Sequence, residues 1–340
     1  MSEGYKIAVV GATGMVGETI LEILEQREFP VSKLFLLASE NSVGKTIQFN
    51  EKSHKVELVD DFDFAEAQIA FFTAGSSVSE EYAQIAADQG CVVIDNTSFF
   101  RYDYDVPLVV PEVNPESIAD FRSRGIIANP NCSTIQMLLA LAPIHRHASI
   151  KRINVATYQA VSGTGKSGVE ELAGQTAKLL NAQTPENKVY PKQIAFNVLP
   201  QIDDFQENGY TKEEMKMVWE TQKILGDESI MVNPTCVRVP VFFGHSEAVH
   251  IECWDSISAE EVKELMAQAS GVELVDEQVD GGYATAVTDA AKNDQVFVSR
   301  IREDISCENA INLWVVADNV RKGAALNSVQ IAEILVQQYI

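Results

Sequence analysis

The first 130 residues alternate short apolar runs with amphipathic stretches, which is the pattern of strands and helices in a parallel sheet. A glycine-rich segment follows the first apolar run and precedes a stretch with apolar residues at helical spacing. A second helical stretch covers residues 80–89. We predict strands at residues 6–10, 33–38, 68–73 and 91–95. This pattern indicates an α/β fold with a Rossmann-type doubly wound parallel sheet.

The pattern changes after residue 132, where apolar and polar positions alternate along residues 154–159, 237–243 and 248–254. Such alternation predicts a second, α+β domain with a mixed or antiparallel sheet. Residues 319–340 have the pattern of one long helix that could return to the first domain. Two further helices are predicted by capping boxes, Thr211 with Glu214 and Ser258 with Glu261. We therefore expect one domain of residues 1–130 and 319–340, and another of residues 131–318.

A cysteine stands between these two regions, in the segment Asn129-Pro130-Asn131-Cys132-Ser133-Thr134. An apolar-periodic stretch begins directly after it, which places the thiol in the first turn of a helix. The partial positive charge of a helix N-terminus favours the thiolate, a nucleophile suited to aldehydes and acyl groups. The alternative is that Cys132 is a small buried apolar residue.

Composition and charge exclude several classes of partner and site. The 340 residues carry a formal net charge of -23, which disfavours nucleic acid and anionic membranes. No apolar run approaches the roughly 20 residues that span a bilayer. The five cysteines are an odd number without a CxxC pair, so we expect neither a disulfide framework nor a metal site. We expect a cytoplasmic protein.

The glycine-rich segment predicts a dinucleotide site. Its glycines permit a tight turn and let backbone N–H groups approach a pyrophosphate; a turn without a ligand is the alternative. Beyond the second predicted strand, hydroxyl groups and Lys45 favour the 2′-phosphate of NADP, whereas Glu40 favours NAD. The residues expected to contact the cofactor here are Gly11, Thr13, Gly14, Met15, Val16, Gly17, Ser39 and Ser42.

Several motifs, taken together and in this order, resemble the aspartate-β-semialdehyde dehydrogenase family. They are residues 11–17, Asn131-Cys132-Ser133-Thr134, residues 159–165, Arg238-Val239-Pro240-Val241 with His245, and residues 324–327. The resemblance spans nearly the whole chain. It implies NADP-dependent, reversible reductive dephosphorylation of L-4-aspartyl phosphate to L-aspartate 4-semialdehyde, in the biosynthesis of lysine, methionine and threonine. It also implies a homodimer formed through the central domain.

The resemblance also implies residue roles. Cys132 corresponds to the nucleophile, His245 to the general acid/base and Gln159 to the residue that orients the acyl intermediate. Arg238 corresponds to the residue that binds the substrate α-carboxylate, and a planar guanidinium suits that task. The remaining substrate and phosphate contacts are expected at Arg101, Asn131, Glu213 and Lys216, and further cofactor contacts at Ser162, Gly163 and Asn327.

Other interpretations of these residues stay open at this point. Arg101 could pair with a nearby aspartate, and Glu213 and Lys216 could form a helix-surface ion pair. We expect His245 in an accessible loop, since it follows Gly244 and precedes a strand. An imidazole with a pKa near its usual value would suit the acid/base role that the resemblance implies. Two alternative functions are an N-acetyl-γ-glutamyl-phosphate reductase, whose cysteine has a different local sequence, and a non-catalytic Rossmann relative.

Overall fold

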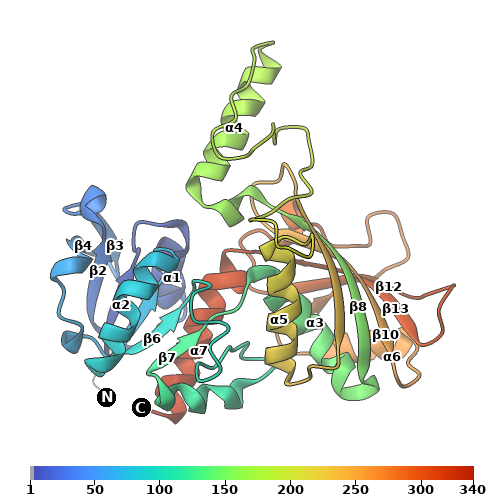
Figure 1. Cartoon of the computed structure of the whole chain (residues 1–340), viewed down its shortest axis with the longest axis horizontal. Coiled ribbons are helices and arrows are strands. Elements are labelled where there is room, and N and C mark those ends of the chain that lie inside the picture. Colours follow the sequence, from blue (N-terminus) through green and yellow to red (C-terminus); the bar gives the residue numbers. More distant parts are fainter. Residues whose placement is uncertain (1–3) are drawn as a thin grey trace. The chain divides into compact units, whose positions relative to one another are not determined.

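The computed structural model describes residues 4–340 and divides the chain into two compact units (Figure 1). The first unit comprises the residues up to Pro130 together with Ala324–Ile340, and the second comprises Asn131–Gly323. The predicted fold class is confirmed: each unit contains one sheet, the first mostly parallel and the second mixed. None of the described helices has the length and apolarity needed to cross a membrane.

The first unit is built on a seven-stranded sheet in the order β3-β4-β2-β1-β5-β6-β7, parallel apart from the antiparallel pair β3–β4. The strand order reverses between β1 and β5: the strands that follow β1 are added on one side of it up to β4, and β5, β6 and β7 are added on the other side. In such sheets, ligands bind at the carboxyl ends of the strands beside this point. The strands are β1 (Tyr5–Val10), β2 (Val31–Ala38), β3 (Thr46–Phe49), β4 (Lys52–Leu58), β5 (Ile69–Phe72), β6 (Val92–Asp95) and β7 (Ile126–Ala128).

Helices cover this sheet with the apolar faces that the sequence pattern indicated. In α1 the buried residues include Ile20 and Leu24, and they join a core that α7 completes with Val329 and Leu335. The C-terminal segment is therefore part of the core of the first unit. The helices are α1 (Met15–Gln26), α2 (Ser76–Asp88) and α7 (Leu326–Gln338), with short helical turns η1 (Glu40–Ser42), η2 (Val59–Asp61), η3 (Phe64–Glu66) and η4 (Pro115–Ser123).

The second unit is built on a six-stranded mixed sheet in the order β11-β12-β13-β10-β8-β9. The pairs β8–β9 and β11–β12 are parallel and the other neighbours are antiparallel. The strands are β8 (Ile150–Gln159), β9 (Met231–Arg238), β10 (His245–Cys253), β11 (Val272–Leu274), β12 (Val296–Glu303) and β13 (Ala310–Ala317).

Helix α3 is the central helix of this unit, and it is buried along most of its length between the sheet, α5 and α6. Helix α4 extends away from the sheet (Figure 1). Both predicted capping boxes are confirmed, at the starts of α5 and α6. The helices are α3 (Cys132–Ala148), α4 (Lys166–Leu180), α5 (Lys212–Leu225) and α6 (Ala259–Gln268), with η5 (Val161–Thr164) and η6 (Ala286–Ala290).

Two predicted elements have different boundaries in the structure. The alternating segment 237–243 is not one strand, since β9 ends at Arg238, two residues before Pro240, which has no N–H for a sheet ladder. The predicted helix 319–340 begins later, because a wide turn, η7 (Arg321–Ala325), precedes α7. The Asp318 carboxylate accepts the N–H groups of Val320 and Arg321, and the Gly323 N–H donates to the Asp318 carbonyl at 3.0 Å.

Candidate active site

Cys132 is the first residue of α3, as the sequence predicted. The side chain of Asn131 caps this helix and accepts the N–H groups of Ser133 and Thr134 at 3.0 and 3.4 Å. The cysteine is half-buried, and the backbone of Gly323 passes so close that a Cβ there would lie 2.9 Å from the Cβ of Cys132. The thiol is thus held at a helix N-terminus, the environment that stabilises a thiolate.

Asn131 is itself held from two sides by carboxylates of α5. Its Nδ2 donates to Oε1 of Glu213 at 2.9 Å, and its backbone N–H donates to Oε2 of Glu220 at 2.6 Å. All three residues are buried. Glu220 was not predicted from the sequence, although it lies two helical turns after Glu213 and so on the same face of the helix.

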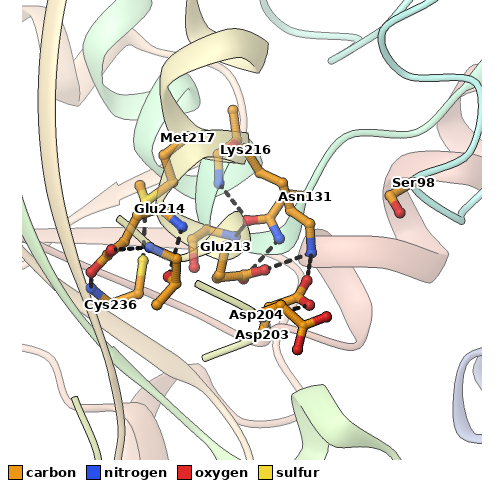
Figure 2. A network of polar contacts seen from close by, with 12 residues as sticks. Ser98, Asn131, Asp203, Asp204, Glu213, Glu214, Lys216, Met217 and Cys236 are labelled. Carbon is orange, nitrogen blue, oxygen red and sulfur yellow. Dashed lines mark hydrogen bonds and ion pairs between the residues drawn. The ribbon is translucent and has the colours of Figure 1, made fainter. Parts of the chain in front are cut away.

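Glu213 is the centre of a buried network with Asn131 and Lys216 (Figure 2), which Gln159 also joins. Its Oε1 accepts Nε2 of Gln159 at 3.0 Å, and its Oε2 accepts Nζ of Lys216 at 2.9 Å. Burial alone would raise the pKa of Glu213, but Lys216 and the amide donors outweigh it and lower the pKa to about 2. The pair predicted from helical spacing is therefore a buried ion pair rather than a surface one.

Lys216 bonds a second carboxylate that was not predicted from the sequence. Its Nζ lies 2.9 Å from Oδ2 of Asp203, in the segment before α5. Burial would lower the pKa of Lys216, but Glu213 and Asp203 together raise it above its usual value. The lysine is therefore cationic and held between two fixed anions.

His245 differs from its prediction, because it is fully buried and is the first residue of β10 rather than an accessible loop residue. Its Nδ1 accepts the N–H of Ala160 at 3.0 Å, so the proton of the neutral ring is on Nε2. Nε2 has no hydrogen-bond partner within residues 4–340. Burial, followed by the nearby Arg238, lowers the pKa of His245 to about 3, so the expected pKa near its usual value is wrong.

Arg238 lies beside His245 and is connected to it through Ala160. The guanidinium donates from Nη1 to the carbonyl of Ala160 at 2.7 Å, while the N–H of Ala160 bonds the histidine. Gly163 borders both side chains: a Cβ on it would lie 2.7 Å from Nη1 of Arg238 and 3.5 Å from Nε2 of His245. The guanidinium and imidazole therefore face a common space that a larger residue at position 163 would fill.

Ser162 is tied to the segment that precedes His245. Its Oγ donates to Oδ1 of Asn319 at 3.0 Å, and the N–H of Gly244 donates to the same oxygen at 2.9 Å. Asn319 was not predicted from the sequence. It links two loops that carry predicted site residues and so fixes their spacing.

In the first unit, the glycine segment has the geometry of a dinucleotide loop. Gly11 has φ +88°, and a Cβ on Gly17 would collide with the Gly11 carbonyl. Gly14 is the N-cap of α1 and offers no capping side chain, so the first N–H groups of Met15, Val16 and Gly17 are available to a ligand. These residues fit a bound pyrophosphate.

Hydroxyl groups and one lysine gather at the carboxyl ends of β1 and β2. Oγ1 of Thr13 donates to Oγ of Ser42 at 3.1 Å, and Nζ of Lys45 donates to the same oxygen at 3.3 Å. Ser39 is the N-cap of η1, directly after β2. This set of donors suits a phosphate on the adenosine ribose. Glu40, the residue that favours NAD, directly follows Ser39 as the first residue of η1.

Two further predicted residues lie in the first unit. Arg101 is buried and donates from Nη2 to the carbonyl of Asn96 at 3.0 Å, and its charge acts on the buried carboxyl of Asp95. Nδ2 of Asn327 donates to Val109 at 3.0 Å and to Asn129 at 2.7 Å. Their roles toward phosphate and cofactor stay predictions.

Comparison with known proteins identifies the family of both units. The model described as "Semialdehyde dehydrogenase, NAD binding domain" matches residues 6–121, and that described as "Semialdehyde dehydrogenase, dimerisation domain" matches residues 141–322. An aspartate-semialdehyde dehydrogenase of Shewanella violacea is 64% identical over 339 residues, covering 100% of both chains.

Solved structures give the same result. The structure of aspartate semialdehyde dehydrogenase II from Vibrio cholerae, complexed with ASA, matches with a TM-score of 0.98 at 62% identity and covers 100% of both chains. The Candida albicans enzyme, solved with NADP, matches with a TM-score of 0.73 at 26% identity over 98% of both chains.

Proposed function

This chain belongs to the aspartate-semialdehyde dehydrogenase family, a family of oxidoreductases with a nicotinamide-binding domain, and we propose that it converts L-4-aspartyl phosphate reversibly into L-aspartate 4-semialdehyde and phosphate. The reaction serves the biosynthesis of lysine, methionine and threonine. One observation carries the proposal: a cysteine at a helix N-terminus shares the second unit with a buried imidazole whose proton is on Nε2 and with a guanidinium beside it.

The first step is attack by the Cys132 thiolate on the acyl carbon of the substrate. A C–S bond forms and the C–O bond to phosphate breaks, so inorganic phosphate leaves with the electron pair and a thioester remains. When bound, the nicotinamide supplies the hydride for reduction of this thioester. His245 holds its Nε2 proton toward the developing oxyanion, which then collapses to the aldehyde and returns the Cys132 thiolate.

The surrounding side chains recognise the rest of the substrate. We assign the α-carboxylate to Arg238, whose guanidinium retains donors beyond the one used on Ala160. We assign the substrate amine to Glu213, which the network keeps ionised. Lys216 and Arg101 would bind the phosphate, because two cations offset the strongly negative charge of the chain.

We propose NADP as the preferred cofactor. Support comes from Thr13, Ser42 and Lys45, which form a group of hydroxyl and ammonium donors without a carboxylate among them. Comparison of kcat/KM for NADP and NAD tests this proposal, and equal values would contradict it. Cofactor contacts at Ser162, Gly163 and Asn327 remain predictions.

We also propose a cytoplasmic homodimer formed through the second unit. The match to a dimerisation domain supports it, as do exposed apolar side chains on and beyond α4, among them Leu180, Phe196 and Val198. Light scattering on the purified protein should give twice the chain mass, and a monomer at micromolar concentration would contradict the dimer.

The activity is tested by phosphate-dependent reduction of NADP in the presence of L-aspartate 4-semialdehyde. We expect turnover that requires both phosphate and this aldehyde. The N-acetyl-glutamate semialdehyde is the matched alternative substrate, and a higher kcat/KM for it would replace our proposal with the reductase. No turnover with either aldehyde would support the non-catalytic relative.

A further inference from the structure

We propose that Asp203 is a positioning residue that directs the Lys216 ammonium toward the phosphate of the substrate. The inference rests on the proposed function, in which Lys216 binds phosphate. The two residues are 13 positions apart, and Asp203 lies in the segment that leads into α5.

The ammonium of Lys216 lies between two carboxylates at equal distance. Nζ is 2.9 Å from Oε2 of Glu213 and 2.9 Å from Oδ2 of Asp203, and the lysine side chain is only 12% exposed. An ammonium has three N–H donors. Two of them are used on these carboxylates, so the direction of the third is fixed by the geometry of the pair. With Glu213 alone, the ammonium could rotate about a single contact.

Asp203 is itself held in place, which is necessary if it is to position the Lys216 ammonium. Its φ is +68°, a left-handed conformation that aspartate tolerates better than most residues. Its Oδ1 accepts the N–H of Asp204 at 3.0 Å, which leaves Oδ2 for the lysine. The carbonyl of Asp204 in turn accepts the N–H of Lys212 at 2.7 Å, so this segment is bonded to the first residue of α5.

A competing role for Asp203 predicts the opposite effect. Two carboxylates and one ammonium carry a net charge of -1. If Asp203 only neutralises Lys216 in place of the phosphate, its carboxylate repels the phosphate and weakens phosphate binding. In that case, removal of its charge would improve phosphate affinity. If Asp203 directs the lysine, removal of its charge weakens phosphate binding. The sign of the change therefore decides between the two roles.

The test is Asp203→Asn, with Asp204→Asn as a matched control that removes the same charge one position away. Initial rates are measured with L-aspartate 4-semialdehyde and NADP while phosphate is varied. We expect Asp203→Asn to raise the KM for phosphate by about tenfold and to leave the KM for the aldehyde within about twofold. The amide carries no charge, and its single oxygen cannot accept both the Asp204 N–H and the Lys216 ammonium, as the two carboxylate oxygens do. Asp204→Asn should leave both values within about twofold.

Asp203→Gly retains the left-handed backbone and should act like Asp203→Asn, which keeps the inference testable if one variant folds poorly. Inorganic phosphate that binds beside Cys132 should slow its alkylation. The phosphate concentration needed for this protection measures the affinity for phosphate without turnover. An unchanged or lower KM for phosphate in both variants would overturn the role of Asp203 alone. Turnover that needs no phosphate in the unaltered protein would overturn the proposed function instead.

Discussion

The glycine loop of the first unit and the buried network of the second are both proposed to bind charged groups, but by different means. The loop uses backbone N–H groups, and its residues lie within seven consecutive positions, 11–17. The network uses side-chain charges from elements up to 89 positions apart, as in the bond between Asn131 and Glu220. The glycine loop works because its glycines have no side chains to block the backbone N–H groups. The network works only if every side chain is present, because each one holds its neighbour in position.

The largest effect is expected from the nucleophile. Cys132→Ala should lower kcat by roughly 10⁴-fold or more, because no other group can form the thioester. NADP affinity, measured by calorimetry, should remain, since the glycine loop belongs to the other unit. More than about 1% residual kcat would exclude covalent catalysis through this residue.

In the glycine loop of residues 11–17, we expect a substitution to weaken cofactor binding by steric collision rather than by loss of charge. In Gly17→Ala the new methyl group meets the Gly11 carbonyl, and we expect NADP affinity to fall by about 10- to 100-fold. The rate of Cys132 alkylation serves as the control and should not change. If NADP binds this variant as tightly as the unaltered protein, the close approach of helix and loop is not required for the cofactor.

The network should depend on hydrogen-bond geometry. Glu220→Ala leaves the Asn131 N–H without its acceptor, which loosens the residue that precedes the nucleophile, and should lower kcat by about 10- to 100-fold. Glu220→Gln keeps an acceptor oxygen and should recover most of this loss. If kcat falls equally in both variants, the negative charge of Glu220 is required rather than the hydrogen bond.

The smallest effect concerns stability rather than catalysis. Glu247 is fully buried, and burial raises its pKa well above 4.5. The unfolded chain ionises this carboxyl near pH 4.5, so above that pH its contribution to the free energy of unfolding falls by about 1.4 kcal/mol per pH unit until the folded-state pKa. Glu247→Gln should therefore have a higher Tm than the unaltered protein at pH 8. The difference should shrink toward pH 4.5, and a constant difference would contradict this origin.

Sequence and structure differ most where a contact joins distant elements. The sequence indicated that His245 is accessible, but it is fully buried in β10, where it pairs with Ala317 of β13, and the Ala160 N–H donates to its ring. Asp203, Glu220 and Asn319 gave no signal, since an isolated acid or amide in a sequence is usually solvated. Their importance arises from the side chains that they contact.

The sequence by itself determined the two kinds of sheet, the start of α3 at Cys132, the two capping boxes and the glycine turn. Each of these signals is local, because caps, turns and periodicity act over a few residues along the chain. Only the tertiary structure decided that Glu213 and Lys216 are buried, that the His245 proton is on Nε2, and that two carboxylates hold Lys216. Burial and charge pairing depend on neighbours in space, and the packing of α3 against α5 and β10, and of β10 against β8, brings those neighbours together.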